Sequence, residues 1–335
     1  METTERLNKN RLSLKIIILF LFSLIICLGA ITFGSIKISF SDVVNFLIGG
    51  NLSQTELFTI LSLRFSRVLL AFSVGAGLSV TGAVFQSILM NPLAEPYILG
   101  VSSGGTFGAI LAIFLGLSFW LVTAFAGIGS IVIIFLVFVL GSRFGELEPN
   151  ILLLTGIMIS AFFSALILLL ITLLNDSLRT AIFWMIGNLA NADPNTVVFI
   201  FPITCVLSFI LSLFAQKYNV LSLGNENALV LGINTKFVKN FSYIVSSLLI
   251  GFIVSISGII GFVGLIIPHI CRMLFGNDNR IIIPTSFFIG GMYLVIADTI
   301  ARTIMLPAEI PVGAITALVG APVFIYLLRK KFYEI

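Results

Sequence analysis

Long apolar runs, separated by short polar breaks, recur along all 335 residues and restrict the fold of this chain more than any other feature. A helix needs ~20 apolar residues to cross ~30 Å of hydrocarbon, whereas barrel strands alternate apolar and polar residues. Charged residues make up only 10% of the chain, against about 25% in an ordinary soluble domain. The runs therefore predict an all-α polytopic membrane protein and exclude both a β-barrel and a typical soluble domain.

We expect ten transmembrane helices. Nine runs give spans near Ile16–Phe33, Val68–Leu89, Ile98–Leu117, Phe119–Leu140, Ile151–Leu174, Val197–Ala215, Phe241–Ser257, Ile281–Met305 and Val312–Leu328. Glycines and Pro268 interrupt the uncharged segment that follows Phe241, which predicts a tenth, short and broken helix near Leu265–Leu274. The first run has the charge order of a signal peptide but no small-x-small cleavage site, so we expect it to remain as a span.

The distribution of positive charge predicts the orientation. With ten spans and both termini in the cytoplasm, the residues left outside are Lys37, Arg64, Arg67, Arg179 and Arg302, and the other thirteen of the 18 Lys and Arg residues lie inside. This bias is the one that membrane proteins show. The net charge of +4 thus reflects topology and does not indicate nucleic-acid binding.

An internal repeat predicts two halves within one transmembrane domain, 1–335. At one constant offset, Gly75, Ser79, Gly82, Leu89, Pro92 and Gly100 correspond to Gly251, Ser255, Gly258, Leu265, Pro268 and Gly276. Five crossings separate the second and seventh spans, so the halves, about 65–175 and 240–330, would be inverted. Inverted halves with helices broken by Gly and Pro are a recurrent transporter design.

Several kinds of chemistry have no sequence support. The chain contains no GxxxxGK[ST] loop, so it cannot itself be a P-loop ATPase, and its one histidine and three scattered cysteines predict no metal site. The middle spans lack carboxylates, which disfavours a secondary carrier driven by an ion gradient. That carrier and a lipid-modifying membrane enzyme remain as alternatives.

Asp298 and Arg302 lie one helical turn apart and predict a structural ion pair.

Three motifs resemble a known family. They are RFSRVLLAFSVGAGLSVTGAVFQSILMNPLAEPYILGVSSG from Arg64, SISGIIGFVGLIIPHICRMLFGNDNR from Ser255 and EIPVGAITALVGAPVFIYLL from Glu309. They resemble the FecCD-type permeases of type II ABC importers, which carry iron-siderophore, haem or cobalamin. The resemblance implies a transport subunit that is not an enzyme and holds no cofactor, with ferric siderophore the most expected cargo, then haem or cobalamin.

The resemblance also implies partners and a location. Two copies of the permease form a homodimer in the lipid bilayer of a bacterial or archaeal inner membrane. Two cytoplasmic ABC ATPases bind ATP and Mg²⁺, and an external or periplasmic substrate-binding protein delivers the cargo. Nucleic acid has no role.

Site residues are carried over from the first motif and from two further ones, ADTIAR from Ala297 and LSLGNENALVLGINTKFVK from Leu221. Binding-protein docking is expected at Arg64, Arg67 and Arg302, which would face outward, and the cytoplasmic gate at Asn91, Pro92 and Leu93. ATPase coupling is expected in the loop 221–239, at Leu221, Gly224, Ala228, Gly232 and Asn234. Gly224, Ala228 and Gly232, four residues apart, predict a small-residue surface that a partner can approach closely.

Overall fold

The computed structural model describes residues 2–34, 39, 41, 43, 48, 59–143, 145–174, 177–190, 192–306 and 308–333. Its helices are α1 (Glu2–Thr32), η1 (Thr59–Phe65), α4 (Ser66–Ile88), η2 (Pro96–Leu99), α5 (Val101–Phe114), α6 (Phe119–Leu140), α7 (Pro149–Thr172), α8 (Leu178–Ile186), α9 (Pro194–Leu213), α10 (Ala215–Leu221), α11 (Asn225–Val230), α12 (Thr235–Ser257), α13 (Val263–Phe275), α14 (Asn279–Thr303) and α15 (Val312–Tyr333). The remaining described elements are two antiparallel strands of two residues each, β1 (Ser142–Arg143) and β2 (Glu146–Leu147), which form a hairpin. The predicted external charge Lys37 lies outside the described residues.

The structure confirms the all-helical class. Within the described residues, seven helices are long and apolar enough to cross a membrane. Three shorter apolar helices accompany them: Val101–Phe114, Val263–Phe275 and Val312–Leu327. Every predicted span coincides with one of these ten helices, although most ends differ by a few residues.

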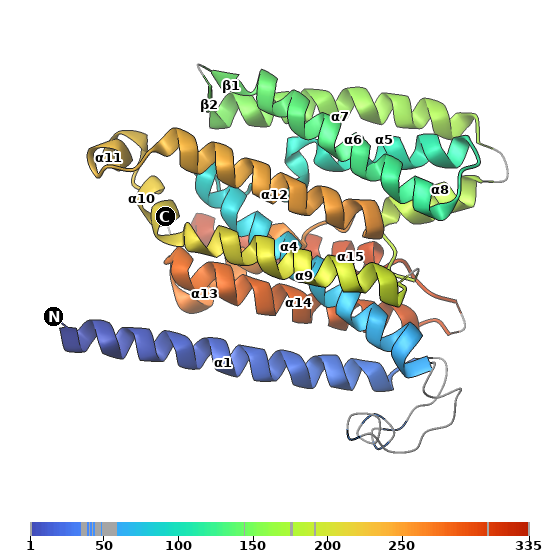
Figure 1. The fold of residues 1–335 in the computed structure, drawn as a ribbon, viewed down its shortest axis with the longest axis horizontal. Helices are drawn as coiled ribbons and strands as arrows, with labels where there is room; N and C mark the ends of the chain where they lie inside the picture. Colours follow the sequence, from blue (N-terminus) through green and yellow to red (C-terminus); the bar gives the residue numbers. More distant parts are fainter. Residues whose placement is uncertain are drawn as a thin grey trace.

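The long helices run side by side between two ends of the molecule (Figure 1). The two chain termini lie at the same end as α10, α11 and the β1–β2 hairpin, which we name the terminal end. The opposite end, which we name the far end, carries η1 and α8. Helix α4 runs from the far end to the terminal end, and α12 runs the other way.

Helix α4 forms the centre of the fold. Of its apolar span, 94% is buried inside this one chain, against 17% for α1 and for α7. Helices α9, α12, α13 and α14 surround α4. The helix backbones approach closely because glycine, which has no side chain, occupies the contact points. Gly75 faces the Gly290 carbonyl of α14, and Gly82 faces the Gly264 carbonyl of α13.

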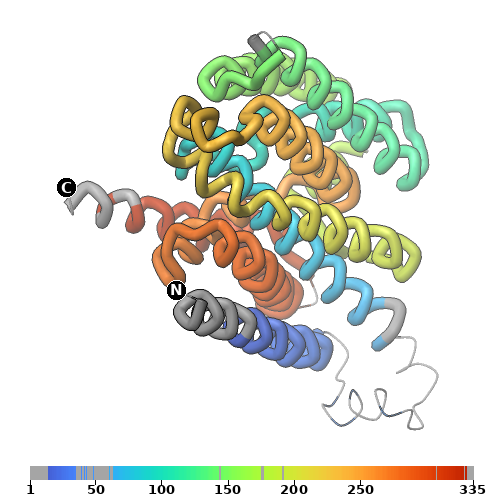
Figure 2. Tube along the Cα trace, turned by 60° about the vertical axis from the view of Figure 1, so that its left-hand side comes forward, coloured from blue at the N-terminus to red at the C-terminus, as the bar shows by residue number. Residues whose placement is uncertain are grey.

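A second packing group lies beside this centre. Helices α5, α6, α7 and α8 pack together on one side, and α1 lies on the other side against α14 (Figure 2). Helix α12 joins the two groups, since the Tyr243 hydroxyl donates a hydrogen bond to the Ile134 carbonyl of α6 at 3.2 Å. Phe20 of α1 meets Phe288 of α14 edge to face.

Helix α12 begins at Thr235, six residues before the predicted start at Phe241. The reason is a buried cation. Lys239 lies within the first turns of α12, and its ammonium group reaches Glu146 of the hairpin at 2.9 Å. Apolar runs cannot detect such a start, because the helix tolerates a charge once a partner neutralises it.

We predict that Gly75→Ala destabilises the fold. The added Cβ would collide with the Gly290 carbonyl oxygen and lie 2.7 Å from the Leu294 Cβ, and overpacking of this kind costs about 1–3 kcal/mol. Gly127→Ala on α6 is the matched control, because its Cβ would meet only the Ser255 Cβ, at 3.9 Å. Thermal unfolding in detergent should separate the two variants. Equal midpoints would contradict the close α4–α14 contact.

Candidate functional site

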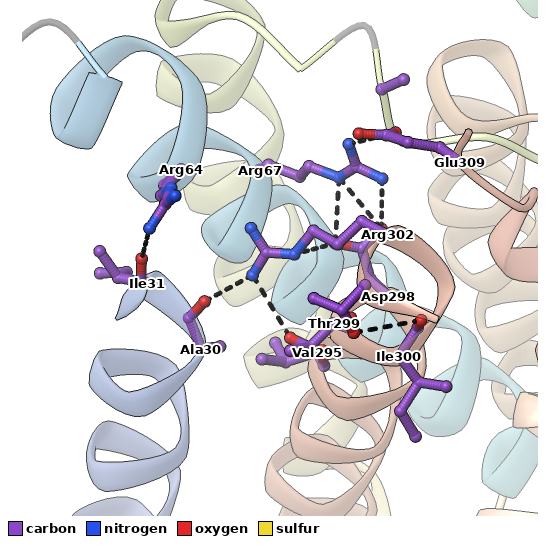
Figure 3. A network of polar contacts seen from close by, with 12 residues as sticks. Ala30, Ile31, Arg64, Arg67, Val295, Asp298, Thr299, Ile300, Arg302 and Glu309 are labelled. Carbon is purple, nitrogen blue, oxygen red and sulfur yellow. Dashed lines mark hydrogen bonds and ion pairs between the residues drawn. The ribbon is translucent and has the colours of Figure 1, made fainter. Parts of the chain in front are cut away.

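A buried cluster of charges lies at the far end (Figure 3). The Arg67 guanidinium of α4 donates hydrogen bonds from Nε and Nη2 to the Asp298 carboxylate of α14, at 3.0 to 3.1 Å. Its Nη1 donates to Glu309 at 2.8 Å. Arg67 is thus held by two carboxylates from the C-terminal part of the chain, one buried and one whose side chain is 44% exposed.

Two further arginines join this charge cluster to α1. Arg302 Nη2 donates to the Ala30 carbonyl at 2.5 Å, and Arg64 Nη1 donates to the Ile31 carbonyl at 2.7 Å (Figure 3). Both carbonyls belong to the last turn of α1, where oxygens have no partner within the helix and carry partial negative charge. The guanidinium groups therefore satisfy the end of α1 and fix it against α4 and α14.

The predicted docking arginines are thus gathered in one place, and all three are buried within this chain. Arg64, Arg67 and Arg302 are only 5%, 9% and 5% exposed. The predicted ion pair is present, with Arg302 Nε 3.8 Å from the Asp298 carboxylate, yet the closer partner of Asp298 is Arg67. Sequence reasoning gave no role to Glu309, although it opens the EIPVG motif.

The predicted gate residues form a turn that follows α4 at the terminal end. Met90 closes the helix with a φ of 49°, and the Asn91 side chain accepts a hydrogen bond from the Leu93 backbone N–H at 2.9 Å. Pro92 and Leu93 are exposed. The Glu95 carboxylate accepts from the Phe262 N–H at 2.8 Å and so anchors the segment after the turn to the start of α13.

The predicted coupling residues surround α11 at the terminal end. Leu221 ends α10 and is buried, while the Asn234 side chain accepts from the Phe237 N–H at 2.9 Å and caps α12. Gly224 and Gly232 flank α11 with φ values of 101° and 77°, which favour glycine. These residues therefore shape the turns on either side of the short helix.

The predicted small-residue surface is wrong. Ala228 is fully buried, because this face of α11 turns toward the rest of the protein. Besides the polar residues Glu226 and Asn227, α11 and its flanks expose four large apolar side chains: Leu223, Leu229, Val230 and Leu231. We name these four the apolar coupling face. Val230, which is 87% exposed, is its most prominent residue.

We predict that Asp298→Ala destabilises the protein far more than Glu309→Ala. The first leaves Arg67 and Arg302 buried without their shared carboxylate, which costs about 3–5 kcal/mol when a buried pair is broken. The second removes a partner that is 44% exposed, for which less than about 1 kcal/mol is expected. Unfolding in detergent measures both losses. Similar losses would contradict the distinction between the two carboxylates.

Comparisons with known proteins agree on one family. The model of the FecCD transport family matches residues 17–330. The ABC transporter permease protein YvrB of Bacillus subtilis is 37% identical over 98% of this chain and 97% of its own. The hemin transport system permease HmuU of Yersinia pestis is 37% identical over 93% of this chain and 94% of its own.

A solved structure agrees with this assignment. An inward-facing conformation assigned to the metal-chelate type of ABC transporter is 33% identical, has a TM-score of 0.85, and covers 94% of this chain and 98% of that one. Sequence and fold thus match over nearly the whole length, which decides against the secondary carrier and the lipid-modifying enzyme. The chain belongs to the FecCD transport family and is the membrane-spanning permease subunit of an ABC importer, which is not itself the ATPase.

Proposed function

We propose that this permease moves metal chelates into the cytoplasm, driven by partner ATPases and supplied by an external substrate-binding protein. The observation that carries the proposal is the match over almost the full length to a metal-chelate transporter, with a TM-score of 0.85. A permease supplies the pathway and obtains its energy from the partners, which must bind its two conformations unequally.

Ferric siderophore is the proposed cargo, with haem and cobalamin next. Relatives named for Fe(3+)-citrate, iron(3+)-hydroxamate, cobalamin and hemin import are 34%, 34%, 35% and 37% identical to this chain. Sequence identity therefore does not favour one cargo over another. Iron complexes are the preferred proposal because more than one of these relatives is named for them. The binding protein would supply much of the selectivity.

We propose ten crossings in two inverted halves, 65–175 and 240–330. Seven long and three shorter apolar helices supply the ten spans, and both termini lie at one end, as an even number of crossings requires. The opposite directions of α4 and α12 support the inversion. The excess of Lys and Arg assigns the terminal end to the cytoplasm and the far end to the outside.

Two copies of the chain would form the pathway between them as a homodimer. Helix α4, the centre of each copy, is 94% buried within its own chain, so it does not itself line a pathway open to a chelate. Helix α7, whose span is only 17% buried, offers a broad apolar face that a second copy can cover. The turn 91–93 at the cytoplasmic end is the proposed gate.

The charge cluster is the proposed anchor for the binding protein. Three guanidinium groups face two carboxylates there, so the cluster keeps a net positive charge that attracts an acidic partner. Glu309 lies at its surface and covers Arg67. The positive electrostatic potential of the cluster would therefore attract the binding protein. An acidic residue of that protein would contact Arg67 once Glu309 moves aside.

The apolar coupling face is the proposed contact with the ATPase. Large apolar side chains exposed at the end of a membrane protein mark a protein interface. A groove on the ATPase would receive Leu229, Val230 and Leu231, while Gly224 and Gly232 hold α11 at its two turns.

Cargo-dependent ATP hydrolysis tests the proposed function. The chain is reconstituted with its partner ATPase and binding protein, and hydrolysis is compared with ferric siderophore, haem, cobalamin and no ligand. We expect the binding protein loaded with a ferric siderophore to raise the rate most. A rate that is indifferent to every metal chelate would overturn the proposal.

We predict that Val230→Asp weakens association with the ATPase. The change places a charge at the centre of an apolar contact, for which a loss of about 2 kcal/mol or roughly thirtyfold in affinity is expected. Met305→Asp is the matched control, because Met305 is also exposed and apolar but lies near the far end. Copurification measures both. Equal retention of the ATPase by the two variants would contradict the assignment of this face.

A further inference from the structure

One helix connects the two proposed partner surfaces. Helix α14 has 25 residues and is ~37 Å long. At the far end it carries Asp298 and Arg302 of the charge cluster. At the terminal end its first residues contact α10, the helix directly before the apolar coupling face.

Within the described residues, one amide side chain joins α10 to the start of α14 by two hydrogen bonds. Asn219 Nδ2 donates to Asp278 Oδ1 at 2.7 Å, and Asn219 Oδ1 accepts from the Asn279 backbone N–H at 2.8 Å. Asp278 is also the N-cap of α14. The Asn219 side chain therefore clamps α10 to the first residues of α14.

The charge state of Asp278 fixes the orientation of this amide. Hydrogen bonds from the Arg280 guanidinium lower the pKa of Asp278 to about 2, so its carboxylate is ionised at neutral pH and can only accept. Asn219 must then present its NH₂ group to Asp278 and its oxygen to Asn279. Both bonds hold only when α10 and α14 keep one relative position.

The same joint reaches α4. Asn279 is only 4% exposed, and its Oδ1 accepts a hydrogen bond from the Ser87 hydroxyl at 3.1 Å, one turn before the gate turn. Further along, Gly75 of α4 and Gly290 of α14 lie in close backbone contact. Close packing at two levels lets α4 and α14 move as one body, since packed cores shift between discrete arrangements and do not deform continuously.

We propose that Asn219 is a positioning residue that transmits binding-protein docking to the ATPase, with α14 as the rigid connection between the charge cluster and α10. The proposal rests on the proposed function. Docking at the far end displaces α14, and the two hydrogen bonds of Asn219 carry α10 along. The apolar coupling face follows, because only three residues separate α10 from α11.

Asn219→Asp is the decisive variant, because it keeps the size of the side chain and removes the donor. It also sets a second carboxylate against the ionised Asp278. We expect the stimulation of ATP hydrolysis by the loaded binding protein to fall about fivefold or more, within the range of typical coupling between sites. Basal hydrolysis and the amount of copurified ATPase should stay at the wild-type level.

A charge exchange provides the rescue. Asn219→Asp combined with Asp278→Asn swaps donor and acceptor, so the bond re-forms, and asparagine is also a good N-cap for α14. We expect stimulation to return to within about twofold of wild type, because the effects of mutations at two residues in direct contact are not additive. The control is Asn240→Ala, which removes a 2.9 Å bond from α12 to the Gly145 carbonyl at the same end without touching α14. It should retain stimulation.

Three results would overturn the proposal: full stimulation in Asn219→Asp, no recovery in the exchanged pair, or loss of the ATPase from purified Asn219→Asp complexes. The last would show that Asn219 serves assembly. Failure of the proposed function is recognised separately, since the wild-type complex would then show no cargo-dependent hydrolysis at all.

Discussion

Close backbone contact between α4 and its neighbours is the interaction on which the rest of the structure depends. Lipid tails are as apolar as the helices, so burial of apolar surface cannot drive helices together within the membrane, and tight packing must do so. Gly75 and Gly82 allow α14 and α13 to approach α4 at backbone distance. The result is a tightly packed centre within the chain, in line with the proposal that the pathway for a chelate runs between two copies.

That tightly packed centre also explains how ionisable groups are accommodated at the far end. Arg67 and Asp298 come from the two helices that pack closely at the glycines, so the helix packing sets the geometry of the pair. Such pairs contribute little net stability compared with apolar packing, but the loss of one partner is costly. The cluster therefore specifies how α1, α4 and α14 are arranged at the side proposed to receive the binding protein.

The sequence predicted the spans because each apolar run is a local signal. It missed the start of α12, since Glu146 neutralises Lys239 from a distant hairpin. It named the three arginines by motif and predicted the local Asp298–Arg302 pair. It could not predict that Arg67 pairs with Asp298 and Glu309, because both lie far from Arg67 along the chain. The spacing of Gly224, Ala228 and Gly232 suggested an exposed small-residue face, but Ala228 is buried, because the packing of α10 and α12 determines which side of α11 is exposed.

This chain provides the transport pathway, and a separate ATPase provides the energy. The decisive experiment is cargo accumulation in sealed vesicles, with the permease paired either with an intact ATPase or with one that binds but cannot hydrolyse ATP. We expect a ferric siderophore to accumulate against its gradient only with the intact ATPase, and an ionophore to have no effect. Accumulation that persists with the inactive ATPase and disappears with the ionophore would contradict it.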